Sequence, residues 1–425
     1  MVSVVCGKNI NSISELLLKT FPIPGKFRNK LPSDIAELSR LLTSSRGERS
    51  LSYLSRPNYL SAYLHYFLPW NILRLCSLLP KLDLNLSDGD TITDFGCGPL
   101  TFACALWITR PDLHNVRLEI NCVDRVSSVL EAGKKFFTAL SAYENDSAVK
   151  WKINIIKKDI NIDRNGENRN KNAGNQKETS KSKNSGLVCA VNMFNEMYDR
   201  VSHNDTEGLR RMAANAASFL HREAADASIL VVEPGVPQSG RFISFLREAF
   251  IELGRAPLSP CAHASVCPMT RENSPRDTRG ARHQDSVKYK KDKWCHFAFD
   301  ADGAPKELKR LSAAAKLPKD RLVFSYLLTG SNAPQKSIPS AFQPQSGNIR
   351  ILSDAFSLPR NRSGRYACSS EGLVLLAGEQ YTIENLKPLD IFENLSHNGG
   401  RSTKEASSSE ETRDEKSGAL IIEVT

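Results

Sequence analysis

The chain has 425 residues, and 40% of them are hydrophobic, enough to form one large domain with additions or two to three smaller ones. Lys and Arg outnumber Asp and Glu by 57 to 47, and the net charge of +10 favours a polyanionic partner such as RNA, although a basic enzyme without nucleic acid has the same balance. No stretch reaches the ~18 apolar residues of a membrane span, and the first residues lack the order of a secretion signal. We therefore expect a mature, cytoplasmic protein without membrane contact.

Residues 1–88 are predicted to be an N-terminal helical region. Apolar residues recur at helical spacing in three stretches: Ile13 to Leu18, Ile35 to Leu42 and Tyr59 to Leu79. Ser55-Arg56-Pro57-Asn58-Tyr59 is typical of a helix start, because proline ends whatever precedes it. The region holds no catalytic constellation, so we interpret it as a helical cap or a partner surface.

Residues 89–255 alternate between strand and helix patterns. Such alternation predicts an α/β fold with a doubly wound, parallel sheet. The expected strands are 91–95, 116–123, 151–156, 186–192 and 227–232, and the expected helices are 102–109, 127–140, 209–221 and 241–253.

Polar segments interrupt this pattern. Residues 163–185 are almost free of apolar side chains and are expected to form a disordered insertion. Residues 271–293 carry eight Lys or Arg against four Asp or Glu, which predicts either a disordered loop or an RNA-facing arm. A tail, 396–425, is expected to be mostly disordered, with Ala419 to Val424 able to add a strand.

A glycine turn directly follows the first expected strand, in Asp94-Phe95-Gly96-Cys97-Gly98-Pro99. Glycines let a backbone turn tightly and approach a ligand closely, and the helix that follows presents free N–H groups. Asp124 ends the next strand, 28 positions after Gly96, where a carboxylate can accept hydrogen bonds from ribose hydroxyls. Asp159 ends the third strand and can meet an adenine amino group. The alternative for the glycine pair is a plain structural turn.

This arrangement resembles the class I methyltransferase pattern of an acidic residue followed by spaced glycines. The resemblance implies a Rossmann-like fold that binds S-adenosylmethionine through Asp94, Gly96, Gly98, Asp124 and Asp159. It departs from the pattern where a third glycine is usual: Leu100 or Thr101 stands there, and such a side chain is expected to narrow the donor pocket. The G-x-G-x-x-G spacing of a dehydrogenase is absent.

The acceptor side of the site is expected at the ends of the fourth and fifth strands, because open α/β sheets bind ligands at the carboxyl ends of their strands. The candidates there are Asn192, Asn195, Glu196 and Glu233. Loop capping by the same side chains is an equally good interpretation. Neither the Asn-Pro-Pro-Tyr signature of amino-group methyltransferases nor a cytosine-C5 nucleophile motif is present, so the acceptor atom stays unnamed.

The ten cysteines fall into two groups. Six lie in apolar runs and are predicted to be small buried side chains: Cys6, Cys76, Cys97, Cys104, Cys122 and Cys189. Four lie in polar, loop-like contexts and are candidate ligands for zinc or an iron–sulfur cluster: Cys261, Cys267, Cys295 and Cys368. Their wide, uneven spacing is unlike a zinc ribbon. His263 and His296 are expected at the surface, with ligand or supporting roles as alternatives.

A second resemblance rests on a series of short motifs spread over residues 50 to 380. These motifs are Ser55 to Tyr59, Glu233-Pro-Gly-Val-Pro, Arg247, Leu253-Gly254, Pro260-Cys261-Ala262-His263, Cys267-Pro268, Trp294-Cys295-His296-Phe297, Phe324-Ser325-Tyr326-Leu327, and Cys368 with Gly372. The series is similar to the methyltransferase-like family of the mitochondrial small ribosomal subunit and its bacterial relatives.

That resemblance implies a small-subunit assembly factor that binds S-adenosylmethionine and holds a [4Fe-4S] cluster on Cys261, Cys267, Cys295 and Cys368, in an extension over residues 256–395 that completes the sheet. We expect a ribosome-associated rRNA methyltransferase or methyltransferase-like factor that is monomeric off the ribosome. One alternative is a non-catalytic assembly or translation factor that binds rRNA. A weaker one is a protein or small-molecule methyltransferase with a structural zinc site.

Overall fold

The computed structural model describes residues 4–43, 45, 53–144, 150–162, 185–201, 205–261, 263–270, 294–330, 348–393 and 412–424. The segments 163–184, 271–293 and 394–411 lie outside the described residues, so the expectations for the two polar insertions and most of the tail stay predictions. Among the described residues, no helix is long and apolar enough to cross a membrane.

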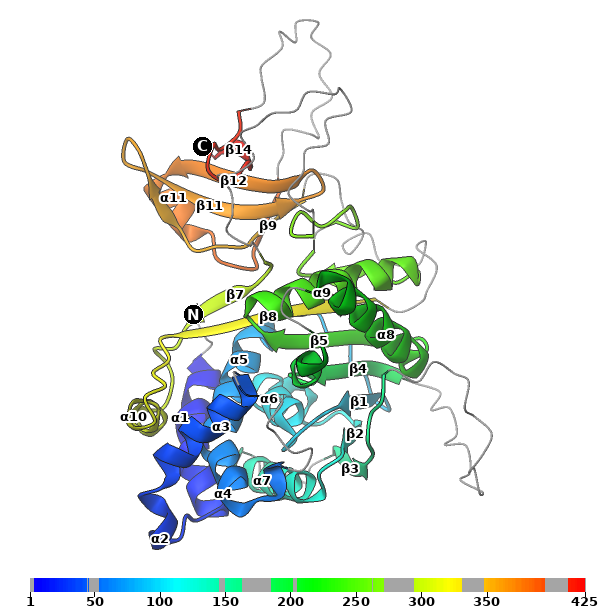
Figure 1. Cartoon of the computed structure of the whole chain (residues 1–425), viewed down its shortest axis with the longest axis vertical. Helices are drawn as coiled ribbons and strands as arrows, with labels where there is room; N and C mark the ends of the chain where they lie inside the picture. The colour runs from blue at the N-terminus through cyan, green and yellow to red at the C-terminus, as the bar shows by residue number, and fades with distance from the viewer. Residues whose placement is uncertain are drawn as a thin grey trace, which may run out of the picture.

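A large α/β sheet forms the centre of the molecule (Figure 1). Its strand order is β3-β2-β1-β4-β5-β8-β6, and β7 pairs with β8. The bounds are β1 Thr91–Phe95, β2 Glu119–Asp124, β3 Lys152–Lys157, β4 Ser185–Val191, β5 Ser228–Pro234, β6 Pro257–Ser259, β7 Phe297–Asp300 and β8 Arg321–Thr329. β1 to β5 pair in parallel, whereas β8 runs antiparallel to β5. This is a doubly wound, Rossmann-like sheet, which confirms the predicted fold class.

Helices cover both faces of this sheet (Figure 1). On one face lie α1 Val4–Thr20, α3 Leu31–Thr43, α4 Pro57–Ala62, α5 Leu68–Leu78, α6 Thr101–Thr109 and α7 Ser127–Glu144, with α2 Gly25–Arg28 and α10 Lys306–Ala314 nearby. On the other face α8 Thr206–Ala224 and α9 Pro237–Glu252 pack on β4 and β5. Each face buries its own apolar cluster, because parallel strands must be covered on both sides. The helix predicted to start near Pro57 does so, with Pro57 at its first position.

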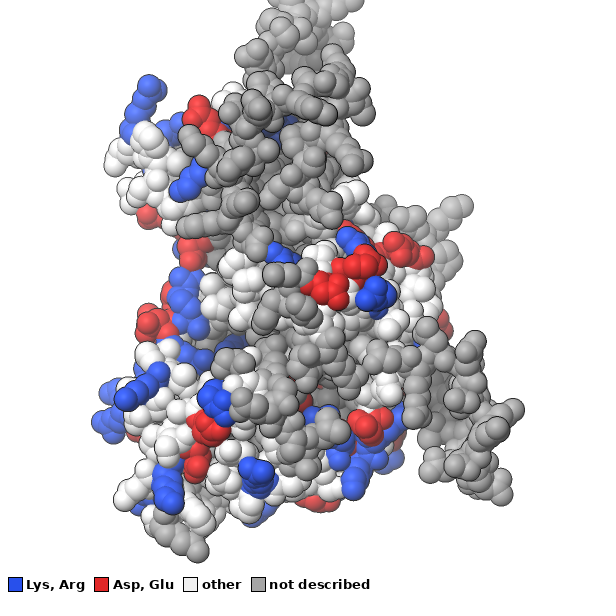
Figure 2. Space-filling view, in the orientation of Figure 1, with Lys and Arg blue, Asp and Glu red and all other residues white. Residues whose placement is uncertain are grey.

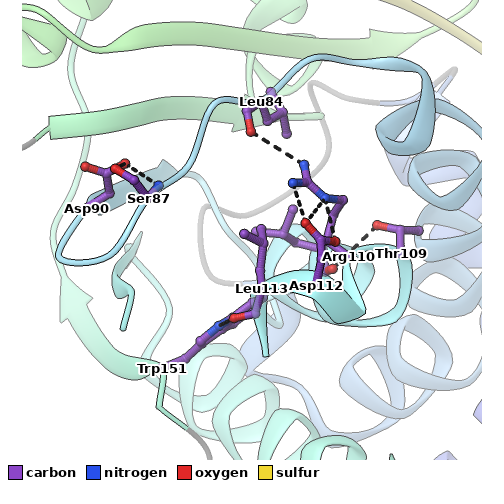
Figure 3. A network of polar contacts seen from close by, with 9 residues as sticks. Leu84, Ser87, Asp90, Thr109, Arg110, Asp112, Leu113 and Trp151 are labelled. Carbon is purple, nitrogen blue, oxygen red and sulfur yellow. Dashed lines mark hydrogen bonds and ion pairs between the residues drawn. The ribbon is translucent and has the colours of Figure 1, made fainter. Parts of the chain in front are cut away.

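Polar contacts fasten the end of the sheet away from the carboxyl ends of its strands (Figure 3). Asp90 precedes β1 and accepts hydrogen bonds from the backbone N–H and the hydroxyl of Ser87, at 2.8 and 3.0 Å. Arg110, after α6, pairs with Asp112 at 2.7 Å, and Trp151 donates its indole N–H to the carbonyl of Leu113 at 2.9 Å. These contacts fix where β1 and β3 begin, and hence where they end.

A second, smaller sheet lies at the top of Figure 1, beyond β7 and α9. Its strand order is β13-β9-β11-β12-β14, and β10 pairs with β11. The bounds are β9 Asn348–Ile351, β10 Phe356–Leu358, β11 Arg362–Ser369, β12 Gly372–Glu379, β13 Ile391–Glu393 and β14 Leu420–Val424, with α11 Gln380–Asn385. The predicted extension is therefore divided: β6 to β8 join the large sheet, and residues from 348 onward build the small one. The strand expected near the C-terminus is β14.

Charges of both signs are interspersed on the face shown in Figure 2, where Lys and Arg lie beside Asp and Glu over the helices. Two examples are the pair Arg210–Glu248 at 2.7 Å and the pair Arg40–Glu37 at 3.0 Å. Exposed pairs of this kind contribute only ~0–1 kcal/mol each. They make the surface hydrophilic and contribute little to the stability of the fold.

Candidate functional site: a donor pocket and a four-cysteine cluster

A pocket opens where β1, β2, β3 and β4 end, on the edge of the sheet predicted to hold the ligand. The residues that line it are Tyr53, Leu54, Tyr63, Gly96, Cys97, Gly98, Thr101, Asp124, Arg125, Val126, Lys158, Asp159, Ile160, Asn161, Val191, Asn192, Met193, Glu196 and Met197. Of the predicted donor residues, the structure brings Gly96, Gly98, Asp124 and Asp159 together here. Asp94 is not among the lining residues.

The two glycines of the turn have left-handed backbones, with φ of +67° at Gly96 and +54° at Gly98. That conformation costs other residues ~1–2 kcal/mol. Space is also short at Gly96, because an added Cβ would lie 2.7 Å from Cγ of Met193. Glycine is therefore required at Gly96 by both backbone and space, and at Gly98 it avoids the cost of a left-handed backbone.

Asp124 is fixed in the pocket by backbone N–H groups. Its Oδ2 accepts a hydrogen bond from Gly98 N at 3.1 Å, and its Oδ1 accepts one from Val126 N at 3.0 Å. Burial raises the pKa of this carboxyl, and the two backbone N–H groups oppose the rise because they favour the ionised form. The carboxylate is thus held in one orientation at the end of β2, with lone pairs left for a ligand's hydroxyls.

Asp94 lies inside the sheet, with an exposed fraction of 0%. No N–H or O–H donor among the described residues reaches either of its carboxylate oxygens. Burial raises its pKa to about 8; contact with the Cys189 thiol opposes the rise, and the charge of Asp124 adds to it. Near neutral pH this side chain is therefore mostly protonated.

Leu100, at the position of the missing third glycine, faces the core and not the pocket. It is fully buried, has a left-handed backbone with φ +56°, and precedes α6. Its side chain packs against α7, where an added Cβ on Gly133 would lie 2.6 Å from Leu100 Cδ1. Of the two residues expected to narrow the pocket, Leu100 therefore does not line it, and Thr101 does.

Two of the four acceptor-side candidates line the pocket and two do not. Asn192, with φ +55°, and Glu196 line the pocket, whereas Asn195 and Glu233 do not. The buried Glu233 carboxylate accepts hydrogen bonds from Phe194 N at 2.8 Å and Asn195 N at 3.0 Å. It therefore caps the short helix Phe194–Arg200, as the loop-capping interpretation holds.

The N-terminal helical region contributes to the pocket wall, which sequence analysis missed. Tyr53 donates its hydroxyl to Glu196 Oε1 at 3.1 Å, and Arg125 approaches Glu196 Oε2 at 3.3 Å. Tyr63 lies beside Gly98, and burial raises the pKa of its phenol above the usual range, with Glu196 and Asp124 adding to the rise. Only the neighbouring Ser-Arg-Pro-Asn-Tyr motif signalled that this stretch matters.

The four polar-context cysteines form a second cluster, between the two sheets. Cys261 and Cys267 follow β6, Cys295 precedes β7, and Cys368 lies on β11 of the small sheet. Burial raises the pKa of Cys295 well above its usual value, and the other three thiols add to the rise. Cys267 and Cys368 are raised in the same way, by burial first and then by neighbouring thiols. Sequence positions up to 107 apart (261 to 368) thus meet in space.

Arg247 and His263 are buried within this cluster, each with an exposed fraction of 3%. Arg247 Nε donates to Cys261 Sγ at 3.1 Å, and His263 Nε2 lies 3.3 Å from Cys368 Sγ. Burial lowers the pKa of Arg247, but the thiols raise it by more, so the net shift is upward. Burial, and then Arg247, lowers the pKa of His263 to about 4. The expectation of a surface position is wrong for His263, because the small sheet covers it.

Among the described residues, no three His, Cys, Asp or Glu side chains are placed to share one metal ion. The four thiols are neighbours without the close approach that a single ion requires. Of the six cysteines predicted to be buried, Cys76, Cys97, Cys104, Cys122 and Cys189 are so, and the side chain of Cys6 lies outside the described residues.

A family model matches this chain over residues 90–354, and its description is "Mitochondrial small ribosomal subunit Rsm22". The match covers more than half of the chain and includes the pocket residues from Gly96 to Met197 together with Cys261, Cys267 and Cys295. The chain belongs to the Rsm22 family. No curated protein matched the full sequence.

Solved structures similar to this Rsm22-family protein include three distant ones. A methyltransferase of Geobacter sulfurreducens with bound S-adenosyl-L-homocysteine is 11% identical, covering 61% of this chain and 90% of its own, with a TM-score of 0.29. YjhP of E. coli is 12% identical, covering 69% and 99%, with a TM-score of 0.29. A TehB-like methyltransferase of Corynebacterium glutamicum is 12% identical, covering 55% and 89%, with a TM-score of 0.23.

Proposed function

We propose that this Rsm22-family protein binds S-adenosylmethionine in the pocket at the ends of β1 to β4 and acts on the small ribosomal subunit. The observation that carries the proposal is Asp124, a carboxylate held by Gly98 N and Val126 N beside two left-handed glycines. A carboxylate at the end of the second strand suits the two ribose hydroxyls of the donor. Gly96 and Gly98 leave the turn open to the methionine part, and Asp159 lies where an adenine amino group can be met.

Binding to the small subunit is proposed from the family and from charge. The family description names that subunit, and the chain carries a net charge of +10. Contacts between Lys or Arg and rRNA phosphates release counterions, so such binding weakens steeply as salt rises. Methyl transfer to rRNA is the reaction that the fold and the partner together suggest. A monomeric, cytoplasmic protein off the ribosome remains our prediction.

A non-catalytic assembly factor is the second candidate, and one observation favours it. The two carboxylates predicted for the acceptor side are both engaged, Glu233 by two backbone N–H groups and Glu196 by Tyr53 and Arg125. A general base must lie within reach of the proton it removes. Glu233 is fully buried and does not line the pocket, and Glu196 is held at the pocket wall by Tyr53 and Arg125. In this case S-adenosylmethionine bound in the pocket would act as a signal or would stabilise the fold, and the protein would transfer no methyl group.

One experiment separates these candidates. Purified small subunits are incubated with the protein and S-adenosylmethionine labelled in its methyl group, and both sedimentation and label in rRNA are measured at low and high salt. The enzyme is supported if the protein sediments with the subunit, the rRNA becomes labelled, and Asp124→Ala abolishes the labelling. Sedimentation without label supports the assembly factor. Failure to sediment at low salt contradicts both.

We also propose that Cys261, Cys267, Cys295 and Cys368 hold a [4Fe-4S] cluster. Four convergent thiols with a buried arginine beside them suit an anionic iron–sulfur group. Four thiolates also hold zinc, at about 2.3 Å from one centre, so zinc is the alternative occupant of this site. Bound there, the cluster would join the small sheet, through Cys368, to the large one.

Metal analysis of anaerobically purified protein tests this proposal. About four iron and four sulfide per chain, with visible absorbance lost in Cys→Ser variants of the four positions, is the expected result. Colourless protein with one zinc per chain would keep the cysteine site but contradict the cluster. Protein without iron, sulfide or zinc would contradict the site altogether.

A further inference from the structure

Arg247 joins two parts of the chain that are separate in sequence. It projects from α9 and is buried, and its Nη2 donates to the carbonyls of His263 and Ser265 at 2.7 and 2.8 Å. Its Nε donates to Cys261 Sγ at 3.1 Å. The guanidinium of Arg247 therefore holds two groups: the backbone of the loop between Cys261 and Cys267, and the sulfur of Cys261.

Among the described residues, no Asp or Glu is paired with Arg247 to balance this buried charge. Burying an unpaired guanidinium is costly, so such a group is normally paired with an anion. The groups that surround it are Cys261, Cys267 and Cys368, which carry negative charge only when they are ionised or bind a metal group. A filled site, with four thiolates around an iron–sulfur core, is anionic and supplies the negative charge that Arg247 lacks when the thiols are protonated.

We propose that Arg247 is the positioning residue of the four-cysteine site: it holds the 261–265 loop against α9 and supplies the positive charge that offsets a bound iron–sulfur cluster. The inference rests on the proposed cluster and adds to it Arg247, a residue that is not itself a cluster ligand. Hydrogen bonds to the sulfurs and nearby charge help to set a cluster's reduction potential. Because reduction adds one negative charge, Arg247 favours the reduced state and raises that potential.

The test compares Arg247→Lys and Arg247→Gln with wild type, all purified anaerobically as full-length protein. Lysine keeps the charge but lacks the planar fork that bonds two carbonyls and a sulfur together, and glutamine removes the charge. Arg222→Gln, an exposed arginine on α8, is the matched control. The measurements are iron and sulfide per chain and the midpoint potential followed by electron paramagnetic resonance.

The three variants are expected to differ in how much iron they lose and in how far the midpoint potential shifts. Arg247→Gln loses iron and its remaining cluster shifts to lower potential, by at least a tenfold change in the ratio of reduced to oxidised cluster, which is about 59 mV for one electron. Arg247→Lys loses iron but keeps a potential closer to wild type, and Arg222→Gln matches wild type in both.

Two outcomes overturn the inference in distinguishable ways. Wild-type protein without iron contradicts the proposed cluster itself, and this inference falls with it. A loaded wild type with equal iron and equal potential in Arg247→Gln contradicts the role of Arg247 alone. If Arg247→Gln does not fold, Arg247→Lys decides, with S-adenosylmethionine binding as the check on folding. Iron below wild type then supports the inference, and wild-type iron content overturns it.

Discussion

Replacing Glu233 with glutamine distinguishes a structural carboxylate from a catalytic one. The carboxylate is fully buried and accepts two backbone N–H groups, those of Phe194 and Asn195. Glutamine keeps one acceptor oxygen and turns an NH2 group toward the other N–H. Hydrogen bonds to a charged group contribute about 1.5–3 kcal/mol each, and an unsatisfied buried donor costs about 1–3 kcal/mol, so we expect Glu233→Gln to lower the free energy of unfolding by about 2–4 kcal/mol.

Thermal unfolding followed by circular dichroism measures this loss. At about 2 °C per kcal/mol, as for larger domains, the midpoint should fall by roughly 4–8 °C. Affinity for S-adenosylmethionine should fall too, because the capped helix carries Glu196 and Met197 of the pocket wall. Glu131→Gln, the same change at an exposed position on α7, should alter neither. A variant with wild-type melting and donor affinity that nevertheless loses methyl transfer would refute the structural role.

Three further predictions concern other parts of the account. Gly133→Ala should destabilise the protein in urea by ~1–3 kcal/mol, although alanine normally favours a helix, because its Cβ would meet the Pro99 carbonyl carbon at 2.5 Å; equal or greater stability would contradict the packing. The folded chain keeps a proton on Asp94 up to about pH 8 that the unfolded chain releases near pH 4, so the free energy of unfolding should fall across that interval in wild type. Asp94→Asn should remove that part of the slope, and an unchanged pH profile would show that the pKa of Asp94 is not raised. Cys368→Ser should lower bound iron and speed amide exchange in β11 and β12, whereas unchanged exchange would argue against a cluster joining the two sheets.

Strands β1 to β5 of the large sheet could be predicted because their patterns are local, whereas β6 to β8 were not predicted as strands. Apolar runs such as Thr91 to Phe95 end in turn residues, and the glycines after β1 signal a backbone that other residues adopt only at a cost. Asp124 follows from its place at a strand end. Such signals lie within a few residues of the feature that they predict.

What could not be predicted depends on contacts between distant segments. Tyr53 reaches Glu196 across 143 positions, and Cys368 meets His263 across 105, and no local pattern reports either. Which of Leu100 and Thr101 faces the pocket could not be predicted, because the sequence does not say on which side of the turn each side chain lies. The small sheet was missed because part of its pairing joins distant segments, such as β12 with β14 and β9 with β13.

Calorimetric titration with S-adenosylmethionine tests the central claim most directly, since the proposed function of this chain starts from the donor pocket. We predict saturable binding to wild type and at least tenfold weaker binding to Asp124→Ala, because the carboxylate would lose its charge-assisted hydrogen bonds to the ribose, about 1.5–3 kcal/mol each. Asp88→Ala, an exposed aspartate paired with Arg117, should bind as wild type does. Absence of binding to the wild-type protein, or equal affinity in Asp124→Ala, would contradict the assignment of the pocket.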